Sequence, residues 1–218
     1  MRLPFPLLAL VLALPASAET LCEGTPVRMT APPAQAETLC TAVQQALPRL
    51  AACGLALETP VSITLTDSLP GDCLGLYHCG EQRIELLAPE ALSEQRRTDG
   101  VFAALPDARY FDSIVMHELA HAAHDARPCP SGLCLATSEY LAYNFQILGL
   151  APEDRARVEA SLDMQSPVSH DAVNKIVLLF APDAFAARAW AHLNQRDDPC
   201  AYLRHVAAGD FTFDRPAR

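Results

Sequence analysis

Residues 111–125 read FDSIVMHELAHAAHD, and this stretch combines a helical pattern with a cluster of polar side chains. Apolar side chains recur through it at helical spacing, and Asp112 or Ser113 can accept hydrogen bonds from the free amides of a first turn. We therefore expect a helix from Asp112 or Ser113 to about Ala126, ended by the prolines that follow. Because apolar residues surround its polar ones, the helix is expected to lie in the core.

The polar residues of this stretch form the pattern HExxH at His117, Glu118 and His121. Two imidazoles four positions apart lie on one helical face, so both can bind one zinc ion through a ring nitrogen. Glu118 lies beside His117 and can hold and deprotonate a water molecule at the metal. We expect one Zn²⁺ per chain as the cofactor, with His117 and His121 as metal ligands and Glu118 as the catalytic base.

A third metal ligand has to come from elsewhere, because a catalytic zinc takes three protein ligands and leaves the fourth position to water. Glu139 lies eighteen positions beyond His121, at the start of a helix expected over Thr137–Leu148. A helix hairpin closed by a loop between Cys129 and Cys134 would bring it to the metal. The alternative is that Glu139 only enriches the first turn of its helix, where the helix dipole favours a carboxylate.

The four residues His117, Glu118, His121 and Glu139 together resemble the gluzincin branch of zinc metallopeptidases, over roughly residues 110–146. The resemblance implies an endopeptidase-like hydrolase of peptide bonds, with Glu139 as the third zinc ligand and a peptide or protein as substrate. It also implies that an edge strand before the motif helix aligns extended substrate, which would correspond to the Arg83–Leu87 segment. The exopeptide-binding motif GAMEN of aminopeptidases is missing.

His124 shares a helical face with His117 and His121, but it lies a turn beyond the metal that they would hold. We therefore expect it to line the cleft or to support the ligands without binding the metal. It also stands where the metzincin pattern requires glycine, which excludes that branch. Asp112 and Asp125 are candidates to orient an imidazole of the motif through its other ring nitrogen.

Hydrolysis of a peptide bond also needs a donor for the developing oxyanion. Candidates are His170, which follows a proline at an expected helix start, and Tyr143 and Tyr140, which flank Glu139 on its helix. Each has a structural alternative. A single histidine can simply cap a helix or lie at the surface, and both tyrosines can be core aromatics with a hydrogen-bonded hydroxyl.

The rest of the chain places a few strands ahead of many helices. Side chains alternate over Pro60–Asp67, and CLGLYHCGEQRIELLAP (residues 73–89) predicts a hairpin that turns at Gly80 and ends in a strand over Arg83–Leu87. Helices are expected over Ala34–Leu50, Thr137–Leu148, Pro152–Asp163, His170–Phe180 and Pro182–Gln195. This order predicts an α+β fold: a small N-terminal sheet or hairpin, followed by a mainly helical, zincin-like domain that disulfides stabilise.

The first 18 residues, MRLPFPLLALVLALPASA, have the form of a secretory signal, with one arginine before an apolar run and small residues at its end. We expect cleavage after Ala18, which leaves 19–218 as a single metallopeptidase domain. No later stretch approaches about 20 uninterrupted apolar residues, so no membrane span is expected in the mature chain. The predicted location is therefore the periplasm or the outside of the cell.

All eight cysteines lie after residue 18, and an even number in an exported chain predicts disulfide bonds, here up to four. The close pairs Cys73 with Cys79 and Cys129 with Cys134 are expected to form local clips. The pairing of the other four stays open: Cys22, Cys40, Cys53 and Cys200. Paired C-x2-C spacing is absent, so a metal role for the cysteines is not expected.

The formal net charge of −10 and a single lysine, Lys175, argue against a nucleic-acid partner, which clustered basic residues would bind. Two alternatives to the peptide hydrolase remain: a catalytically inert, zinc-retaining binding domain held by disulfides, and a zinc amidase acting on cell-wall peptides. Glu118 favours an enzyme, because a zinc held only for structure needs no base. The sequence does not indicate an oligomeric state.

Overall fold

The computed structural model describes residues 18–127, 129, 130, 132 and 134–214. Residues 1–17, which carry most of the expected signal sequence, lie outside this described part. Within it, no helix combines the length and the apolar character that crossing a membrane requires.

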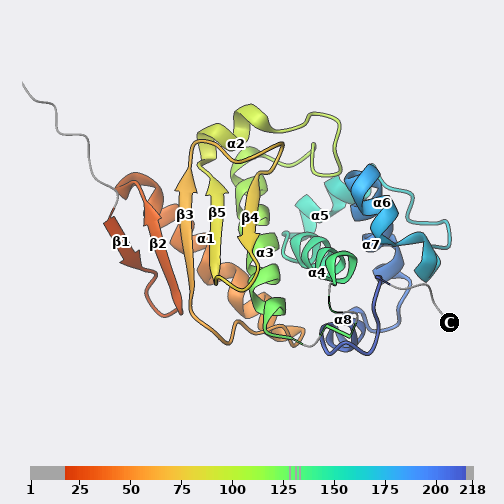
Figure 1. Cartoon of the computed structure of the whole chain (residues 1–218). Helices are drawn as coiled ribbons and strands as arrows, with labels where there is room; N and C mark the ends of the chain where they lie inside the picture. Colours follow the sequence, from red (N-terminus) through yellow and green to blue (C-terminus); the bar gives the residue numbers. More distant parts are fainter. Residues whose placement is uncertain (1–17, 128, 131, 133, 215–218) are drawn as a thin grey trace, which may run out of the picture.

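A single five-stranded sheet forms the N-terminal part of the described chain (Figure 1), in the order β1-β2-β3-β5-β4. The strands are β1 (Ala18–Leu21), β2 (Val27–Ala31), β3 (Val61–Thr66), β4 (Gly75–His78) and β5 (Arg83–Leu87). The central strands β2, β3 and β5 run parallel, and both edge strands run antiparallel to their neighbours. The alternation expected around β3 is confirmed, because Val61 and Ile63 are buried and Ser62 and Thr64 are only half-buried.

The predicted hairpin is confirmed, but the edge strand is its other arm. β5 pairs with β3 on one side and with β4 on the other, so it has no free edge. The free edge on this side of the sheet belongs to β4, and the assignment of a substrate-aligning edge to Arg83–Leu87 is wrong. Alternating side chains predict which face of a strand is buried, whereas strand order depends on pairing with β3, a segment about 20 residues away.

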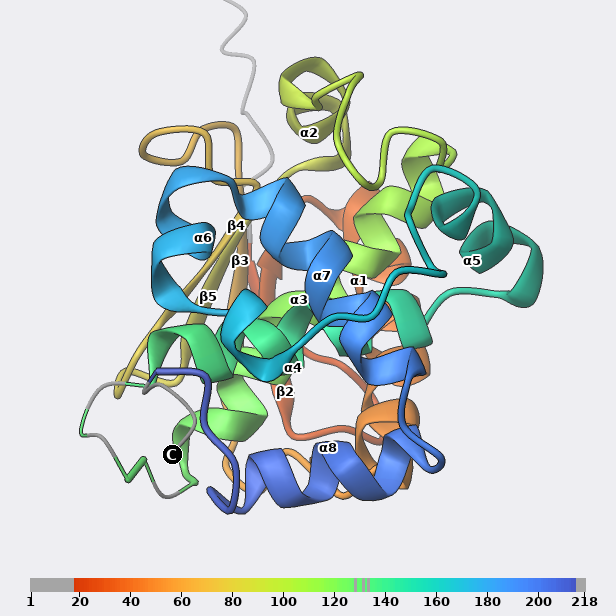
Figure 2. The ribbon, with the colours of Figure 1, turned by 90° about the vertical axis from the view of Figure 1, so that its right-hand side faces the viewer.

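Helices fill the rest of the described chain, so the fold is α+β as predicted. They are α1 (Pro33–Ala52), α2 (Pro89–Gln95), α3 (Asp107–Asp125), α4 (Leu135–Leu148), α5 (Pro152–Glu159), the 3₁₀ turn η1 (His170–Ala172), α6 (Lys175–Phe180), α7 (Pro182–Asn194) and α8 (Pro199–Ala207). α3 packs against α1, β4 and β5, and α4 packs against α3. Seen from the C-terminal side, α6, α7 and α8 lie in front of the sheet, around α4 (Figure 2).

Two helix predictions need correction. α3 begins at Asp107, five residues before Asp112, and the Asp107 carboxylate accepts hydrogen bonds from Ser93 and Arg96 of the preceding segment. The helix expected over His170–Phe180 is broken into η1 and α6. Asn174 caps α6 by accepting hydrogen bonds from two backbone amides with its side chain, which requires a non-helical backbone at that residue.

Three disulfides link the described residues: Cys22–Cys40, Cys53–Cys200 and Cys129–Cys134. The expected Cys129–Cys134 clip is confirmed, whereas Cys73 and Cys79 are free thiols, so the expected clip between them is wrong. All four residues of β4 lie between these two cysteines. Since a strand rises about 3.3 Å per residue, their Cα atoms are on the order of 20 Å apart, and a disulfide needs less than about 7 Å.

Candidate metal centre

α3 and α4 bring three side chains to one point. The Nε2 atoms of His117 and His121 lie 3.1 Å apart, and the two carboxylate oxygens of Glu139 each lie 3.5 Å from one of them. All the potential ligand atoms lie within 4.8 Å of one another, so the group could hold one metal ion. Both histidines lie on α3 as predicted, and Glu139 lies on the next helix, in its second turn and not its first, because α4 begins at Leu135.

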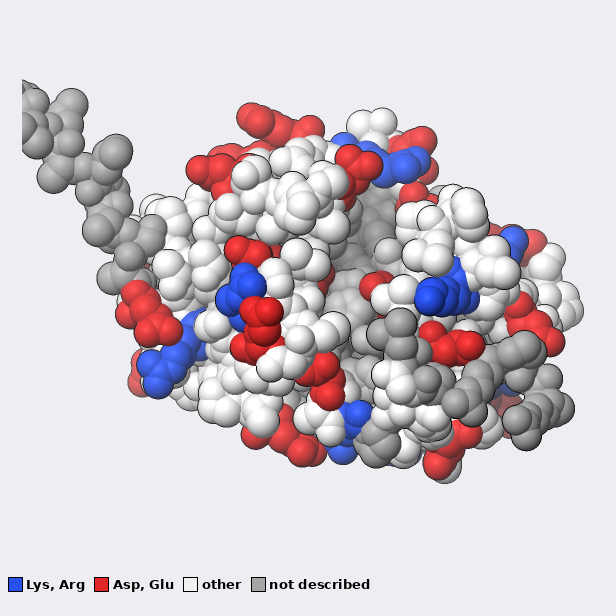
Figure 3. Space-filling view, viewed as in Figure 1, with Lys and Arg blue, Asp and Glu red and all other residues white. Residues whose placement is uncertain are grey.

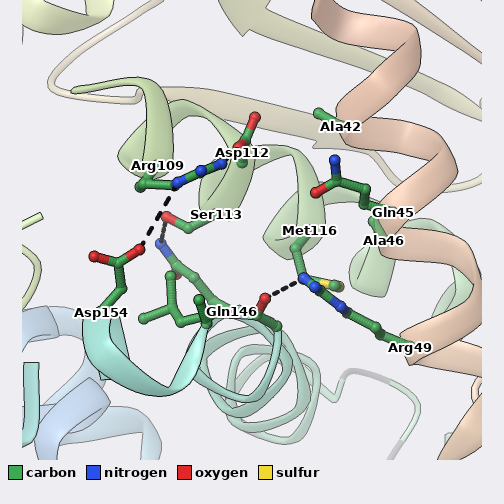
Figure 4. Close-up of a pocket in the computed structure, with 13 residues that line it drawn as sticks. Ala42, Gln45, Ala46, Arg49, Arg109, Asp112, Ser113, Met116, Gln146 and Asp154 are labelled. Atoms are coloured by element: carbon green, nitrogen blue, oxygen red, sulfur yellow. Dashed lines mark hydrogen bonds and ion pairs between the residues drawn. The ribbon is translucent and has the colours of Figure 1, made fainter. Parts of the chain in front are cut away.

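A chain of hydrogen bonds fixes which nitrogen of His117 carries the proton. Ser113 Oγ donates to the carbonyl of Tyr110 at 2.7 Å, so it is an acceptor for Gln146 Nε2 at 3.1 Å. This contact (Figure 4) orients the Gln146 amide, whose Oε1 then accepts from His117 Nδ1 at 2.9 Å. Nδ1 therefore carries a proton, and Nε2 points to the other ligands.

His121 is held in the same way by its own α4 partner. Its Nδ1 lies 2.8 Å from Ser138 Oγ, one position before Glu139. With Nδ1 bonded there, Nε2 faces the group. Gln146 and Ser138 are supporting residues that the sequence did not reveal, because their role depends on how α4 lies against α3.

The two aspartates expected to orient the imidazoles contact other groups instead. Asp112 forms an ion pair with Arg109 at 3.3 Å. Asp125 accepts hydrogen bonds from the Tyr77 hydroxyl and from the amide of Gly80, both at 2.9 Å. Asp125 therefore ties the end of α3 to the β4–β5 hairpin, and neither aspartate contacts a ligand ring.

Burial and neighbouring charges set the protonation states of the three residues in the group. Burial raises the pKa of Glu139, but the charges of His121 and His117 outweigh it and lower that pKa to about 2. Burial lowers the pKa of His121 to about 4, so this ring is neutral at neutral pH. Burial also lowers the pKa of His117, but its hydrogen bond to Glu139 and the charge of that carboxylate raise it overall. The Glu139 carboxylate and the neutral His121 ring are therefore ready to bind a cation, whereas a metal bound at His117 Nε2 would displace the proton that Glu139 stabilises there.

Glu118 lies beside this group without joining it. The side chain is 6% exposed, and burial raises its pKa to about 7. The backbone of Tyr77 in β4 lowers this pKa, but by less than burial raises it. A carboxylate with a pKa near neutrality can accept and return a proton under physiological conditions, which is the property required of a general base.

A cleft of about 720 Å³ runs past these residues. Figure 3 shows the surface hollowed between the half of the molecule that carries the sheet and the half that carries α6 and α7. β4 and α3 form one wall, and α4 and the start of α7 form the other. His124 lines the cleft as expected and does not belong to the metal-binding group. The free thiols of Cys73 and Cys79 line the β4 wall.

Of the three candidate oxyanion donors, Tyr143 lies at the site. Its ring packs edge-on against His117, with centroids 4.7 Å apart, and it lines the cleft. Burial, together with the charges of Glu139 and Asp183, raises the pKa of Tyr143, so its hydroxyl keeps its proton and can donate it. The charge of Glu118, which also lines the cleft, adds to this shift.

The other two candidates lie elsewhere. The Tyr140 side chain is fully buried, and its hydroxyl bonds His192 Nδ1 at 2.9 Å. His170 stacks on Phe213, with ring centroids 4.6 Å apart, and it is not among the residues that line the cleft. The prediction of His170 as a cleft residue is wrong, because it sits in the η1 turn beyond α4 and not at the start of a helix that faces the metal group.

One family model matches residues 27–216, and its description is a family of unknown function (DUF6639). No curated protein and no solved structure matches the chain.

Proposed function

We propose that this chain, which belongs to the DUF6639 family, is an exported zinc-dependent hydrolase of peptide bonds, similar to the gluzincins. The observation that carries the proposal is the convergence of His117, His121 and Glu139 beside a buried carboxylate in an open cleft. Two nitrogen donors and one oxygen donor, with one side open to the cleft, are the ligand set of catalytic zinc sites. A structural site would close its fourth position with another side chain.

Each residue then has a role that its surroundings support. Zinc, when bound, would supply Lewis acidity toward a carbonyl oxygen and toward water. Glu118 takes the proton from the attacking water and passes it to the leaving amine, and its pKa of about 7 suits both steps. Tyr143 donates its hydroxyl hydrogen to the oxygen of the attacked carbonyl. The free edge of β4 provides backbone groups that an extended peptide can pair with.

The location outside the cytoplasm is supported by three disulfides in the described chain. Such bonds persist in oxidising compartments and are rare where thiol reductants are abundant. Together with the signal-like residues 1–18, they favour a peptide or protein substrate in the periplasm or outside the cell. Of the alternatives, an inert zinc-retaining domain is disfavoured by the placement of Glu118, and an amidase for cell-wall peptides differs only in substrate.

The proposal is tested by comparing the mature protein with Glu118→Gln on a library of internally quenched peptides and, separately, on peptidoglycan fragments. We expect Glu118→Gln to retain the metal and to lose on the order of 10³-fold in kcat, because only the proton acceptor is removed. Cleavage of the peptidoglycan fragments but not of the quenched peptides would show that the protein is an amidase for cell-wall peptides. A variant as active as wild type on either substrate would contradict the role of Glu118.

A further inference from the structure

Two residues of β4, Gly75 and Tyr77, lie on the face of the strand that is turned toward α3. Side chains alternate along a strand, so Gly75 and Tyr77 share one face. Tyr77 is buried, and its hydroxyl reaches Asp125 near the end of α3. Gly75 lies opposite Glu118, in the middle of the same helix. The strand therefore presents an aromatic ring to the end of α3 and no side chain at all to the catalytic carboxylate.

The space above Gly75 is already occupied by Glu118. A Cβ atom added to Gly75 would lie 2.6 Å from Oε1, 2.7 Å from Cγ and 2.9 Å from Cδ of Glu118. These separations are too short for any non-bonded contact with carbon, so every other amino acid at position 75 would displace the carboxylate or the strand.

The backbone conformation does not explain this glycine. Glycines with positive φ occur elsewhere in the described chain, for example Gly71 and Gly80 on either side of β4, and nothing lies within 4 Å of the Cβ position of either one. Gly75 is not among them, so any residue could adopt its backbone angles. Position 75 requires glycine because the Glu118 side chain fills the space that a Cβ atom would need.

We propose that Gly75 is a positioning residue, which holds the Glu118 carboxylate against the backbone of β4. The missing side chain leaves free the space that the Glu118 carboxylate fills beside the β4 backbone. The position of the general base is thereby fixed relative to the strand edge that would align the substrate. The catalytic consequence rests on the proposed function, whereas the steric contact does not.

The contact is tested by a double-mutant cycle on thermal stability, measured on metal-free mature protein. We expect Gly75→Ala to lower Tm by about 5 °C, the usual effect of overpacking in a chain of this size. In a Glu118→Ala background the clashing atoms are gone, so the same substitution should cost less than about 1 °C. If Gly75→Ala alone does not fold, the double variant should fold.

A matched control is Gly149→Ala at the end of α4. Its Cβ would also clash, but with Met116 Cε at 2.7 Å and not with Glu118. Gly149→Ala should therefore lower Tm by the same amount with or without Glu118→Ala. Equal costs of Gly75→Ala in the two backgrounds, or failure of the double variant to fold while Gly149→Ala folds, would overturn the assignment of Gly75.

The catalytic consequence has its own readout. Gly75→Ala should lose on the order of 10²-fold in kcat, with KM and zinc content close to wild type, because a misplaced base affects the reaction more than binding. If the stability cycle shows coupling and kcat is unchanged, the positioning role is wrong although the contact is real. Absence of any hydrolysis by wild type would instead count against the proposed function and leave the stability cycle intact.

Discussion

At the scale of single residues, the site depends on side chains that never touch the metal position. Gln146 is 1% exposed and lies between His117 and Ser113, to which it bonds with its oxygen and its nitrogen respectively. Without it, the buried Nδ1 of His117 would lose its partner, and the ring could turn or change tautomer. The ring orientation therefore comes from α4.

We expect Gln146→Ala to weaken zinc binding by about 10- to 100-fold, the usual effect of removing a side chain that orients a ligand histidine. Competition with a chromophoric chelator measures this directly. His170→Ala is the control, because His170 lies outside the cleft, and its zinc affinity should equal that of wild type. Unchanged affinity in Gln146→Ala would show that the ring is held by other contacts.

How much of the site could be predicted depends on how local each relation is. His117, Glu118 and His121 follow from helix geometry alone, and Glu139 needed only the assumption that two consecutive helices form a hairpin. The roles of Gln146 and of Gly75 could not be predicted, because they depend on contacts between α4 and α3 and between β4 and α3. The sequence contains no periodic signal for either contact.

At the scale of elements, the β4–β5 hairpin contributes to one wall of the cleft through β4. A charge cluster strengthens it: Glu85 of β5 lies 2.6 Å from His78 Nε2 and 3.0 Å from Arg83. The hydrogen bond from His78 and the contacts with Arg83 lower the pKa of Glu85, although burial opposes them. The hairpin thus prefers the ionised form of this carboxylate.

Because the pKa of Glu85 is lowered in the folded chain, its contribution to the stability of the fold depends on pH in a known direction. A carboxylate whose pKa is lower in the folded than in the unfolded chain stabilises the fold above the unfolded pKa, and this contribution disappears as the pH falls through the folded pKa. We therefore expect the difference in Tm between wild type and Glu85→Gln to shrink on acidification below about pH 4. A difference independent of pH would show that the ion pairs of Glu85 do not stabilise the fold.

The second prediction for this element concerns the two thiols that flank β4. Because an intact β4 keeps Cys73 and Cys79 apart, we expect two free thiols per mature chain under non-reducing conditions. Titration with a thiol reagent in denaturant counts them, and peptide mapping identifies them. A fourth disulfide between Cys73 and Cys79 would mean that β4 does not keep its extended form in the oxidised protein.

At the scale of the whole molecule, the disulfides differ in what they connect. Cys53–Cys200 joins the end of α1 to α8 across 147 positions, whereas Cys22–Cys40 spans only 18. In the chain-entropy account, a longer closed loop gives more stabilisation, about 5 kcal/mol for the first and about 3 kcal/mol for the second. This pairing was not predictable, because it depends on where α8 lies in the fold.

We therefore expect Cys53→Ala/Cys200→Ala to lower the free energy of unfolding by more than Cys22→Ala/Cys40→Ala does. Denaturant titration followed by circular dichroism measures both. Each double variant retains the other two disulfides and serves as the comparison for the other. An equal or reversed order would show that loop length does not set the stabilisation in this fold.

The central claim is that His117, His121 and Glu139 hold one zinc ion, and elemental analysis of the oxidised mature protein tests it most directly. The account predicts one zinc per chain in wild type and in Glu118→Gln, and a large loss of zinc in folded Glu139→Ala, which lacks one ligand. Wild-type protein that binds no metal after incubation with zinc, or Glu139→Ala that retains it fully, would contradict the account.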